Sequence, residues 1–391
     1  MSNNTLGSKI EVPSSQIHFI DLEAQQAKIR SQVDRAIKQV LDHGIYIMGP
    51  EVAEFEKNLG TFCGVKHNLS CSNGTDALAF GLMAFGIEPG DAVFVPSFTF
   101  AATAEVVTWF GATPIFIDVL EDTYNMDPRS LEKGIALAKK LSLTPKGIIP
   151  VDLFGLPADY DAIESIAKSH SLWIMADAAQ SFGASYKGRQ VGTLGEITTT
   201  SFFPAKPLGC YGDGGAVFTN NDEYAAVMRS IRVHGQGSDK YDNVRVGMNG
   251  RLDTLQAAIL LQKLAIFPEE IKARNLVAQR YQKGLHDVVK TPSVPEGLTS
   301  VWAQYTVQLP ENIDRKQFMS KLQEAKIPSV VYYVKPLHLQ TAYKHYPSVD
   351  GNLPISEKLA ECVLSLPMHP YLPERTQDYI IEGFRDLISK A

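Results

Sequence analysis

A single lysine lies in a stretch of chain that can form neither a helix nor a regular strand. Residues 201–216 hold four glycines and two prolines, and an apolar strand is expected on each side, at 197–203 and 216–219. An amine that attacks a carbonyl group must be neutral and fixed in position, and burial lowers the pKa of a lysine. Lys206 is therefore a candidate for covalent catalysis. A charged loop tip is the alternative.

A carboxylate is expected at the end of a buried strand upstream of this loop. Residues 172–175 are a short apolar run, typical of a buried parallel strand, and Asp177 follows them. Open α/β sheets bind their ligands beyond the carboxyl ends of their strands. Asp177 and the nearby Gln180 are therefore candidate ligand-binding residues, although Asp177 could equally be the N-cap of a helix.

A third candidate site is the small, polar turn 70–76, which leads directly into an apolar helix at 77–85. The free N–H groups at the start of a helix and the positive end of its dipole attract anions, and Gly74 lets the backbone come close. The turn therefore predicts an anion site. A simple N-cap by Asn73 or Thr75 is the alternative.

Alternating strands and helices are expected to hold these three segments together. This alternation predicts an α/β fold with a mostly parallel sheet and helices on both of its faces. Ahead of the sheet, helices are expected at 25–43 and 51–63, after a short edge strand at 17–21. Further strands are expected at 92–96, 113–118, 147–151 and 172–175, and further helices at 101–110 and 160–169.

Pro268 is expected to mark a hinge between two domains, because proline interrupts helices. Helices at 222–233 and 253–264 precede it. The expected divisions are a leader and arm (1–48), a large domain (49–267) and a small α+β domain (268–391), with residues 1–16 disordered. In the small domain, helices are expected at 270–287, 314–325, 356–364 and 374–389, and strands at 304–309 and 328–334.

The composition is that of an ordinary globular protein. Of 391 residues, 45% are hydrophobic and 20% charged, and the formal net charge is −6. There is no long basic run, signal peptide or long apolar segment, which argues against nucleic acid or a membrane as partner. The four cysteines have no zinc spacing, so the cytoplasm is the expected compartment, with Cys71 and Cys210 as small apolar core residues.

The motifs around Asp177, Gln180 and Lys206 resemble those of the DegT/DnrJ/EryC1/StrS family of sugar aminotransferases. The resemblance extends from about Phe19 to about Leu387. It implies the aspartate-aminotransferase fold (fold type I) and pyridoxal 5'-phosphate as cofactor, with pyridoxamine 5'-phosphate as its intermediate form. It also implies a homodimer with shared active sites.

The resemblance assigns a role to each candidate residue. Lys206 would link covalently to the cofactor and carry protons, Asp177 would pair with the ring nitrogen, and Gln180 would bond the ring's 3-oxygen. Phe100 would lie flat against the ring, although an aromatic residue in this position is more often part of the core. The cofactor phosphate would be bound by Thr75, the Asp76 backbone and Ser201, and by Asn249 of the second subunit.

The implied reaction is amino transfer from L-glutamate to a nucleotide-linked keto sugar, for surface polysaccharide synthesis (O-antigen or capsule). Lys206 favours transfer, since histidine replaces this lysine in the related dehydratases. The Pro-Ala-Lys-Pro variant of the loop resembles the branch that acts on UDP-2-acetamido-2-deoxy-3-keto-glucuronate. Another nucleotide 3-keto or 4-keto hexose is the runner-up, and a protein of the same fold that binds ligand without catalysis is the alternative of another class.

Three further residues are expected at the sugar. The resemblance places Tyr46 beside the substrate pocket and Arg251 and His338 near the sugar carboxylate, with the arginine from the partner subunit. A guanidinium can grip a carboxylate through two parallel hydrogen bonds. The alternative is that Arg251 pairs with Asp253 or caps a helix, and that His338 is only packed in a loop.

Overall fold

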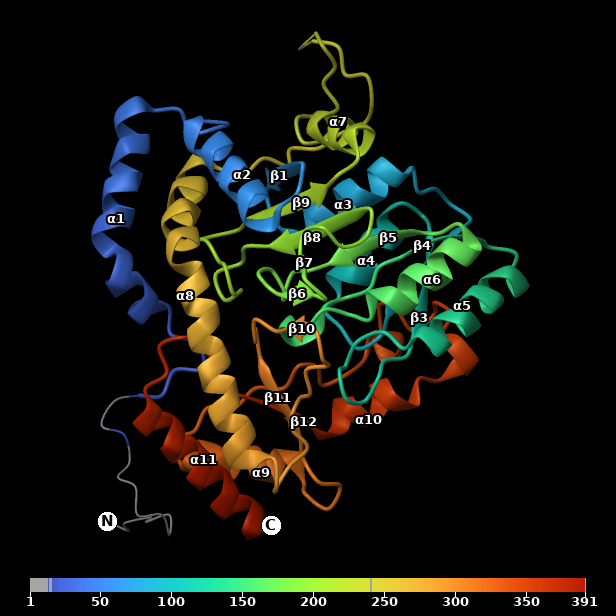
Figure 1. Cartoon of the computed structure of the whole chain (residues 1–391). Coiled ribbons are helices and arrows are strands. Elements are labelled where there is room, and N and C mark those ends of the chain that lie inside the picture. Colours follow the sequence, from blue (N-terminus) through green and yellow to red (C-terminus); the bar gives the residue numbers. More distant parts are fainter. Residues whose placement is uncertain (1–12, 14–15, 240, 391) are drawn as a thin grey trace.

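A seven-stranded sheet forms the centre of the larger part of the molecule. The computed structural model describes residues 13, 16–239 and 241–390 (Figure 1). The strand order is β1-β9-β8-β5-β4-β2-β3, and β9 runs antiparallel to both its neighbours while the other pairs are parallel. The expected mostly parallel sheet is confirmed. Its strands are His67–Cys71 (β1), Asp91–Pro96 (β2), Thr113–Ile117 (β3), Thr144–Ile148 (β4), Trp173–Asp177 (β5), Ile197–Ser201 (β8) and Gly215–Thr219 (β9).

Helices pack against this sheet and form two apolar layers with it. One layer includes residues of α3 to α6, and the other includes residues of α2 and α8. The sequence patterns missed α5, although it carries ordinary signals: Asp127 caps its first turn, and Leu131, Ile135 and Ala138 face inward. The helices are Leu22–His43 (α1), Pro50–Cys63 (α2), Gly74–Phe85 (α3), Ala102–Trp109 (α4), Pro128–Lys140 (α5), Tyr160–His170 (α6) and Asp222–Ile231 (α7).

Pro268 does not break the chain into two helices. Helix α8 runs without interruption from Thr254 to Leu285, 32 residues, with Pro268 inside it. Its first half buries Leu260 and Phe267 in the core of the large part, and its second half buries Tyr281 in the core of the small part. Packing on two cores outweighs the hydrogen bond that a proline removes. The helix is seen in Figure 1 as the gold element that connects both parts.

The smaller part is built on a two-stranded antiparallel sheet, β11 (Tyr305–Gln308) and β12 (Val363–Leu366). The strand expected at 328–334 is wrong, because only Val330 makes a bridge there, to Ser365. The edge strand expected at 17–21 is also absent from the described residues, although Phe19 accepts a hydrogen bond from Met368 N. The helices are Arg315–Glu324 (α9), Pro354–Cys362 (α10) and Glu374–Ser389 (α11), and a small three-stranded sheet joins β10 (Leu298–Thr299), β6 (Ser185–Tyr186) and β7 (Arg189–Gln190).

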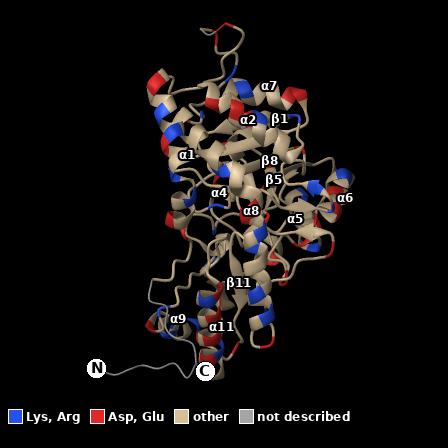
Figure 2. Cartoon of the chain, turned by 60° about the vertical axis from the view of Figure 1, so that its left-hand side comes forward, with Lys and Arg blue, Asp and Glu red and all other residues tan. Residues whose placement is uncertain are grey.

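The surface charges, the helix lengths and the cysteines can be compared with what the composition predicts. Acidic and basic residues are interspersed along α1 and around α9 and α11 on the face shown in Figure 2. Of the described helices, none is both long and apolar enough to cross a membrane. All four cysteines are unpaired, and Cys71 and Cys210 are buried. The disorder expected for residues 1–16 falls almost entirely outside the described part of the chain.

Candidate active site

Asp177 is the last residue of the central strand β5, where its carboxylate is buried and held by two donors. Thr103 Oγ1, on α4, donates to Oδ2 at 2.8 Å, and Ala179 N donates to Oδ1 at 3.2 Å. Burial raises the pKa of Asp177, while these two hydrogen bonds and the Lys206 charge oppose the rise. Turns rather than a helix follow this residue, so the N-cap alternative is excluded.

Lys206 lies in the irregular loop between β8 and β9. The loop is closed at its base by hydrogen bonds from Phe202 N to Gly214 O (2.7 Å) and from Cys210 N to Phe202 O (2.8 Å). The lysine is half-buried, so it is not a loop tip in solvent. Burial lowers the pKa of Lys206, and the nearby Asp177 carboxylate partly opposes this. The lysine and the aspartate therefore interact electrostatically, as a covalent catalyst and its charge partner would.

The turn between β1 and α3 has the shape of an anion site, with one departure from expectation. Gly74 packs on Ser201 so closely that a Cβ atom there would lie 2.7 Å from the Ser201 Cβ. However, Asp76 N donates to Asn73 Oδ1 at 2.8 Å, so the Asp76 amide is already engaged and Asn73 is an N-cap. The N–H groups of Gly74 and Thr75 begin the helix and have no partner within it.

Phe100 and Gln180 are the two other residues expected at the cofactor ring. The Phe100 side chain is 60% exposed, so it does not belong to the core, unlike Phe98. Gln180 is buried, where its Oε1 accepts from Phe154 N at 2.7 Å and its Nε2 donates to Tyr333 OH at 3.2 Å. The Gln180 amide is thus held in place by two groups that the sequence did not single out.

The segment that carries Asn249 and Arg251 lies beside the turn between β1 and α3. Ser72 N donates to Gly250 O at 3.2 Å. Asn249 is exposed, and Arg251 is partly buried with no hydrogen bond or ion pair to any described residue. The pairing of Arg251 with Asp253, which was the alternative, is therefore not formed.

Tyr46 lies close to this segment but faces solvent. Its carbonyl accepts from Thr254 N at 2.9 Å, and Ile47 forms a bridge with Asp253. The Tyr46 side chain is 48% exposed. The Tyr46 ring is therefore available to a ligand or a second subunit.

His338 does not have a free ring nitrogen with which to bind a sugar. Its Nδ1 is 2.7 Å from Ser97 Oγ and its Nε2 is 3.1 Å from Glu357 Oε1. The hydrogen bond to His338 lowers the pKa of Glu357. This is the arrangement of the packed-loop alternative, and contact of His338 with substrate stays a prediction, which would require one of these two hydrogen bonds to be exchanged.

Sequence reasoning missed Thr103, Tyr333 and a second buried carboxylate, Asp152. Asp152 follows Val151, which bridges in parallel with Asp177. Asp177 was predicted as an acidic residue that follows a buried strand, and the same signal could have identified Asp152. No local signal marks Tyr333, because it reaches Gln180 only through the fold.

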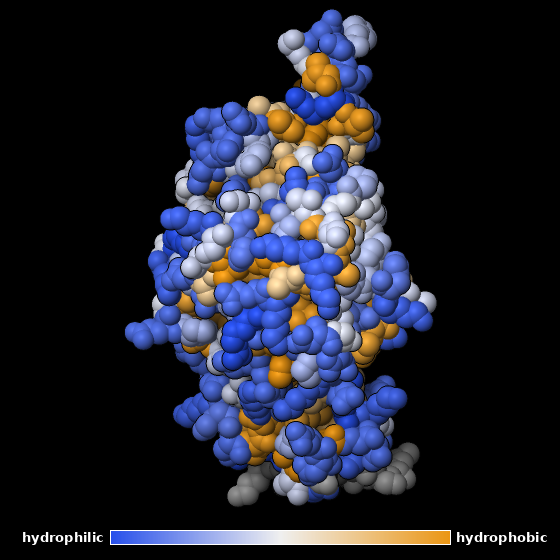
Figure 3. Space-filling model, turned by 90° about the vertical axis from the view of Figure 1, so that its right-hand side faces the viewer, coloured by the Kyte–Doolittle hydropathy of each residue, from blue (hydrophilic) through white to orange (hydrophobic). Residues whose placement is uncertain are grey.

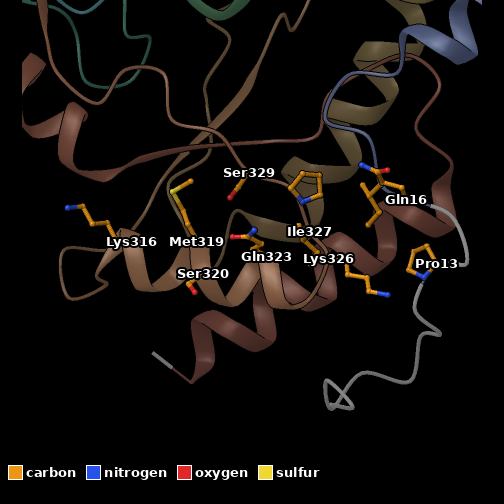
Figure 4. A pocket seen from close by; sticks show the side chains of 11 residues that line it. Pro13, Gln16, Lys316, Met319, Ser320, Gln323, Lys326, Ile327 and Ser329 are labelled. Carbon is orange, nitrogen blue, oxygen red and sulfur yellow. The ribbon is translucent and has the colours of Figure 1, made fainter. Parts of the chain in front are cut away.

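A cavity beside α9 is not this site. It has a volume of about 870 Å³ and lies between α9 and the N-terminal segment, lined by residues such as Gln16, Met319 and Ile327 (Figure 4). None of the candidate residues lines it. Among the described residues there is also no cluster of side chains suited to a metal ion.

The residues around Lys206 fit pyridoxal 5'-phosphate. A half-buried amine suits its aldehyde, a buried carboxylate suits its ring nitrogen, and an exposed aromatic ring suits its flat face. The two free amides of α3, with Ser201 beside them, suit its phosphate.

Comparisons with known proteins agree with this reading. Residues 27–385 match the model of the DegT/DnrJ/EryC1/StrS aminotransferase family. The chain is 50% identical to a UDP-2-acetamido-2-deoxy-3-oxo-D-glucuronate aminotransferase of Pseudomonas aeruginosa, over 91% of this chain and 96% of that one. A family member of known structure from Brucella abortus is 56% identical, with a TM-score of 0.92 over 94% of this chain and 98% of that one. The pyridoxal-phosphate form of a sugar aminotransferase from Streptococcus pneumoniae is 27% identical, with a TM-score of 0.85 over 97% and 99% of the two chains.

Proposed function

Because the chain belongs to the DegT/DnrJ/EryC1/StrS aminotransferase family, we propose that it transfers an amino group from L-glutamate to UDP-2-acetamido-2-deoxy-3-keto-glucuronate. The observation that carries the proposal is the half-buried Lys206 amine in the loop after β8, within electrostatic reach of the buried Asp177 carboxylate at the end of the neighbouring strand β5. The 50% identical relative, which is named for this sugar, supports the choice of substrate. The product would serve surface polysaccharide synthesis, and the four unpaired cysteines support a cytoplasmic setting.

Each residue has a distinct task in this reaction. Pyridoxal phosphate, when bound, supplies a ring that withdraws electrons from the carbon that loses a proton. Lys206 Nζ, whose pKa is lowered by burial, accepts that proton and returns it, as a general base and then an acid. Asp177 holds a proton at the ring nitrogen, and Gln180, fixed by Phe154 and Tyr333, orients the ring. A glutamate-driven change in the visible absorption of the purified protein, followed by assays with nucleotide keto sugars, tests this proposal against the non-catalytic alternative.

A homodimer is part of the proposed function, and exposed apolar side chains support it. The run 45–48 has four exposed large hydrophobic residues, and Phe203, near Lys206, is 52% exposed. Residues 234–239 and 241–246 project from the molecule at the top of Figure 1, and hydrophobic residues gather at the base of this projection in Figure 3. On this segment Val246 is 84% exposed. Exposed large hydrophobic residues in such number mark a protein interface, and we propose that a second copy covers these segments.

Mixing Lys206→Ala, which lacks the amine, with Arg251→Ala, which should bind the uronate weakly, should restore activity if the sites are shared. We expect these subunits, unfolded and refolded together, to reach about a quarter of wild-type turnover when the uronate is kept well below its KM for Arg251→Ala. Random pairing makes half of the dimers hybrid, and each hybrid then holds one complete site of two. If Arg251 acts within its own subunit, the mixture will show no more activity than the two variants measured separately.

The choice of a uronate can be tested at Arg251. We expect Arg251→Ala to raise KM for the uronate far more than for a 6-deoxy keto sugar, because only the uronate has a carboxylate for the guanidinium to grip. Arg251→Lys should recover part of the loss, since it keeps the charge but not the paired geometry. Steady-state kinetics on both sugars gives the comparison.

Arg129→Ala, which removes an exposed arginine of α5, is the matched control and should leave both KM values unchanged. Equal losses on the two sugars in Arg251→Ala would mean that Arg251 binds the diphosphate or supports the fold. The substrate would then be assigned only as a nucleotide keto sugar.

A further inference from the structure

A second buried acidic residue, Asp152, is a backbone neighbour of Asp177 at the carboxyl end of β5. Asp152 is completely buried, with an exposed fraction of 0%. Its N–H donates to Asp177 O at 3.1 Å, and Asp177 N donates to Pro150 O at 2.9 Å. The two acidic residues therefore lie on neighbouring segments that are joined through their backbones.

Three donors and no cation surround the Asp152 carboxylate. Ala158 N and Tyr160 OH both donate to Oδ1 at 2.9 Å, and Ser181 Oγ donates to Oδ2 at 2.7 Å. Burial raises the pKa of Asp152 to about 7, and the nearby Asp177 carboxylate adds to the rise. An unpaired buried carboxylate is costly, so packing alone does not account for an aspartate here.

The contacts of Asp152 bind two turns together. The first turn is 152–156 and the second is 177–181, which carries Asp177 and Gln180. Besides the backbone bond to Asp177, Phe154 N donates to Gln180 Oε1 at 2.7 Å, and Ser181 donates to the Asp152 carboxylate. The first turn thus holds the second turn at three points, which are Asp177, Gln180 and Ser181.

We propose that Asp152 is a positioning residue that aligns Asp177 and Gln180 toward the ring of the cofactor. Asp152 would act indirectly, through its hydrogen bonds with Ser181 and with the Asp177 backbone. This inference rests on the proposed roles of Asp177 and Gln180. A misplacement of about 1 Å in a catalytic constellation can cost on the order of a hundredfold in rate, so loosening the turn should be measurable.

Two substitutions, each of which removes one hydroxyl that donates to the Asp152 carboxylate, distinguish a positioning role of Asp152 from a purely structural one. Ser181→Ala cuts the bond between Asp152 and the turn that carries Gln180, while Tyr160→Phe cuts a bond on its other side. We expect Ser181→Ala and Asp152→Ala each to weaken binding of pyridoxal 5'-phosphate to the apoprotein and lower kcat, both by about tenfold or more. We expect Tyr160→Phe to lower Tm comparably to Ser181→Ala but to leave cofactor binding and kcat near wild type.

The measurements are absorbance titration of apoprotein with pyridoxal 5'-phosphate, Tm of the apoprotein, and kcat. If Ser181→Ala and Tyr160→Phe change all three alike, Asp152 has only a structural role and the inference is overturned. Asp177→Asn is measured in parallel. If it too leaves cofactor binding and kcat unchanged, the proposed function itself fails, and this outcome differs from the failure of Asp152 alone.

Discussion

Replacing Lys206 by alanine or arginine should abolish amino transfer and leave the fold intact. The primary amine is the group that can join a carbonyl carbon and exchange its proton, and arginine is too basic for either task. The Lys206 side chain makes no hydrogen bond or ion pair to the described residues, so its removal should not disturb the loop. Turnover, the visible absorption of added pyridoxal phosphate and circular dichroism are the three measurements.

Lys57→Ala provides the control, because Lys57 is an exposed lysine of α2 that lies in none of the candidate segments. It should keep full turnover. More than trace turnover in Lys206→Ala or Lys206→Arg would show that another group performs the proton transfer, and the assignment of the active site would have to be abandoned.

The catalytic segments could be predicted because their signals are local. The loop around Lys206 is stiffened by its own glycines and prolines, and Asp177 follows a strand whose apolar run is continuous. Both features depend on neighbours in the sequence. The structure added what those neighbours cannot encode, namely that Lys206 and Asp177 influence each other's pKa.

Other predictions failed where tertiary contacts outweigh local preference. Pro268 was expected to end a helix, but α8 continues through it because each half of the helix is buried in a different core. The partners of the His338 ring are likewise set by the fold, because Ser97 and Glu357, which contact its two ring nitrogens, lie 241 and 19 positions away in the sequence. Neither outcome is visible in a short window of sequence.

Asp177→Asn should keep the shape of the site and lower turnover by orders of magnitude. Asparagine has nearly the same size and can still accept from Thr103, but it carries no negative charge to hold a proton on the ring nitrogen. The cofactor ring then withdraws electrons less well from the carbon that must lose its proton. We expect kcat to fall far more than KM rises, because the missing charge acts mainly in the transition state.

Asp118→Asn is the matched control for this substitution. Asp118 also follows a strand of the sheet, β3, and is buried, but it accepts its hydrogen bonds from Ile355 and Ser356 at the start of α10. Its replacement should lower Tm and leave kcat close to wild type. Asp177→Asn should instead lower kcat and leave Tm close to wild type. A change in kcat of less than about tenfold for Asp177→Asn, or about 1.4 kcal/mol of transition-state stabilisation, would mean that the charge at the end of β5 supports only the local structure. In that case the ring nitrogen would need another partner, and the pairing proposed between Asp177 and the ring nitrogen would be wrong.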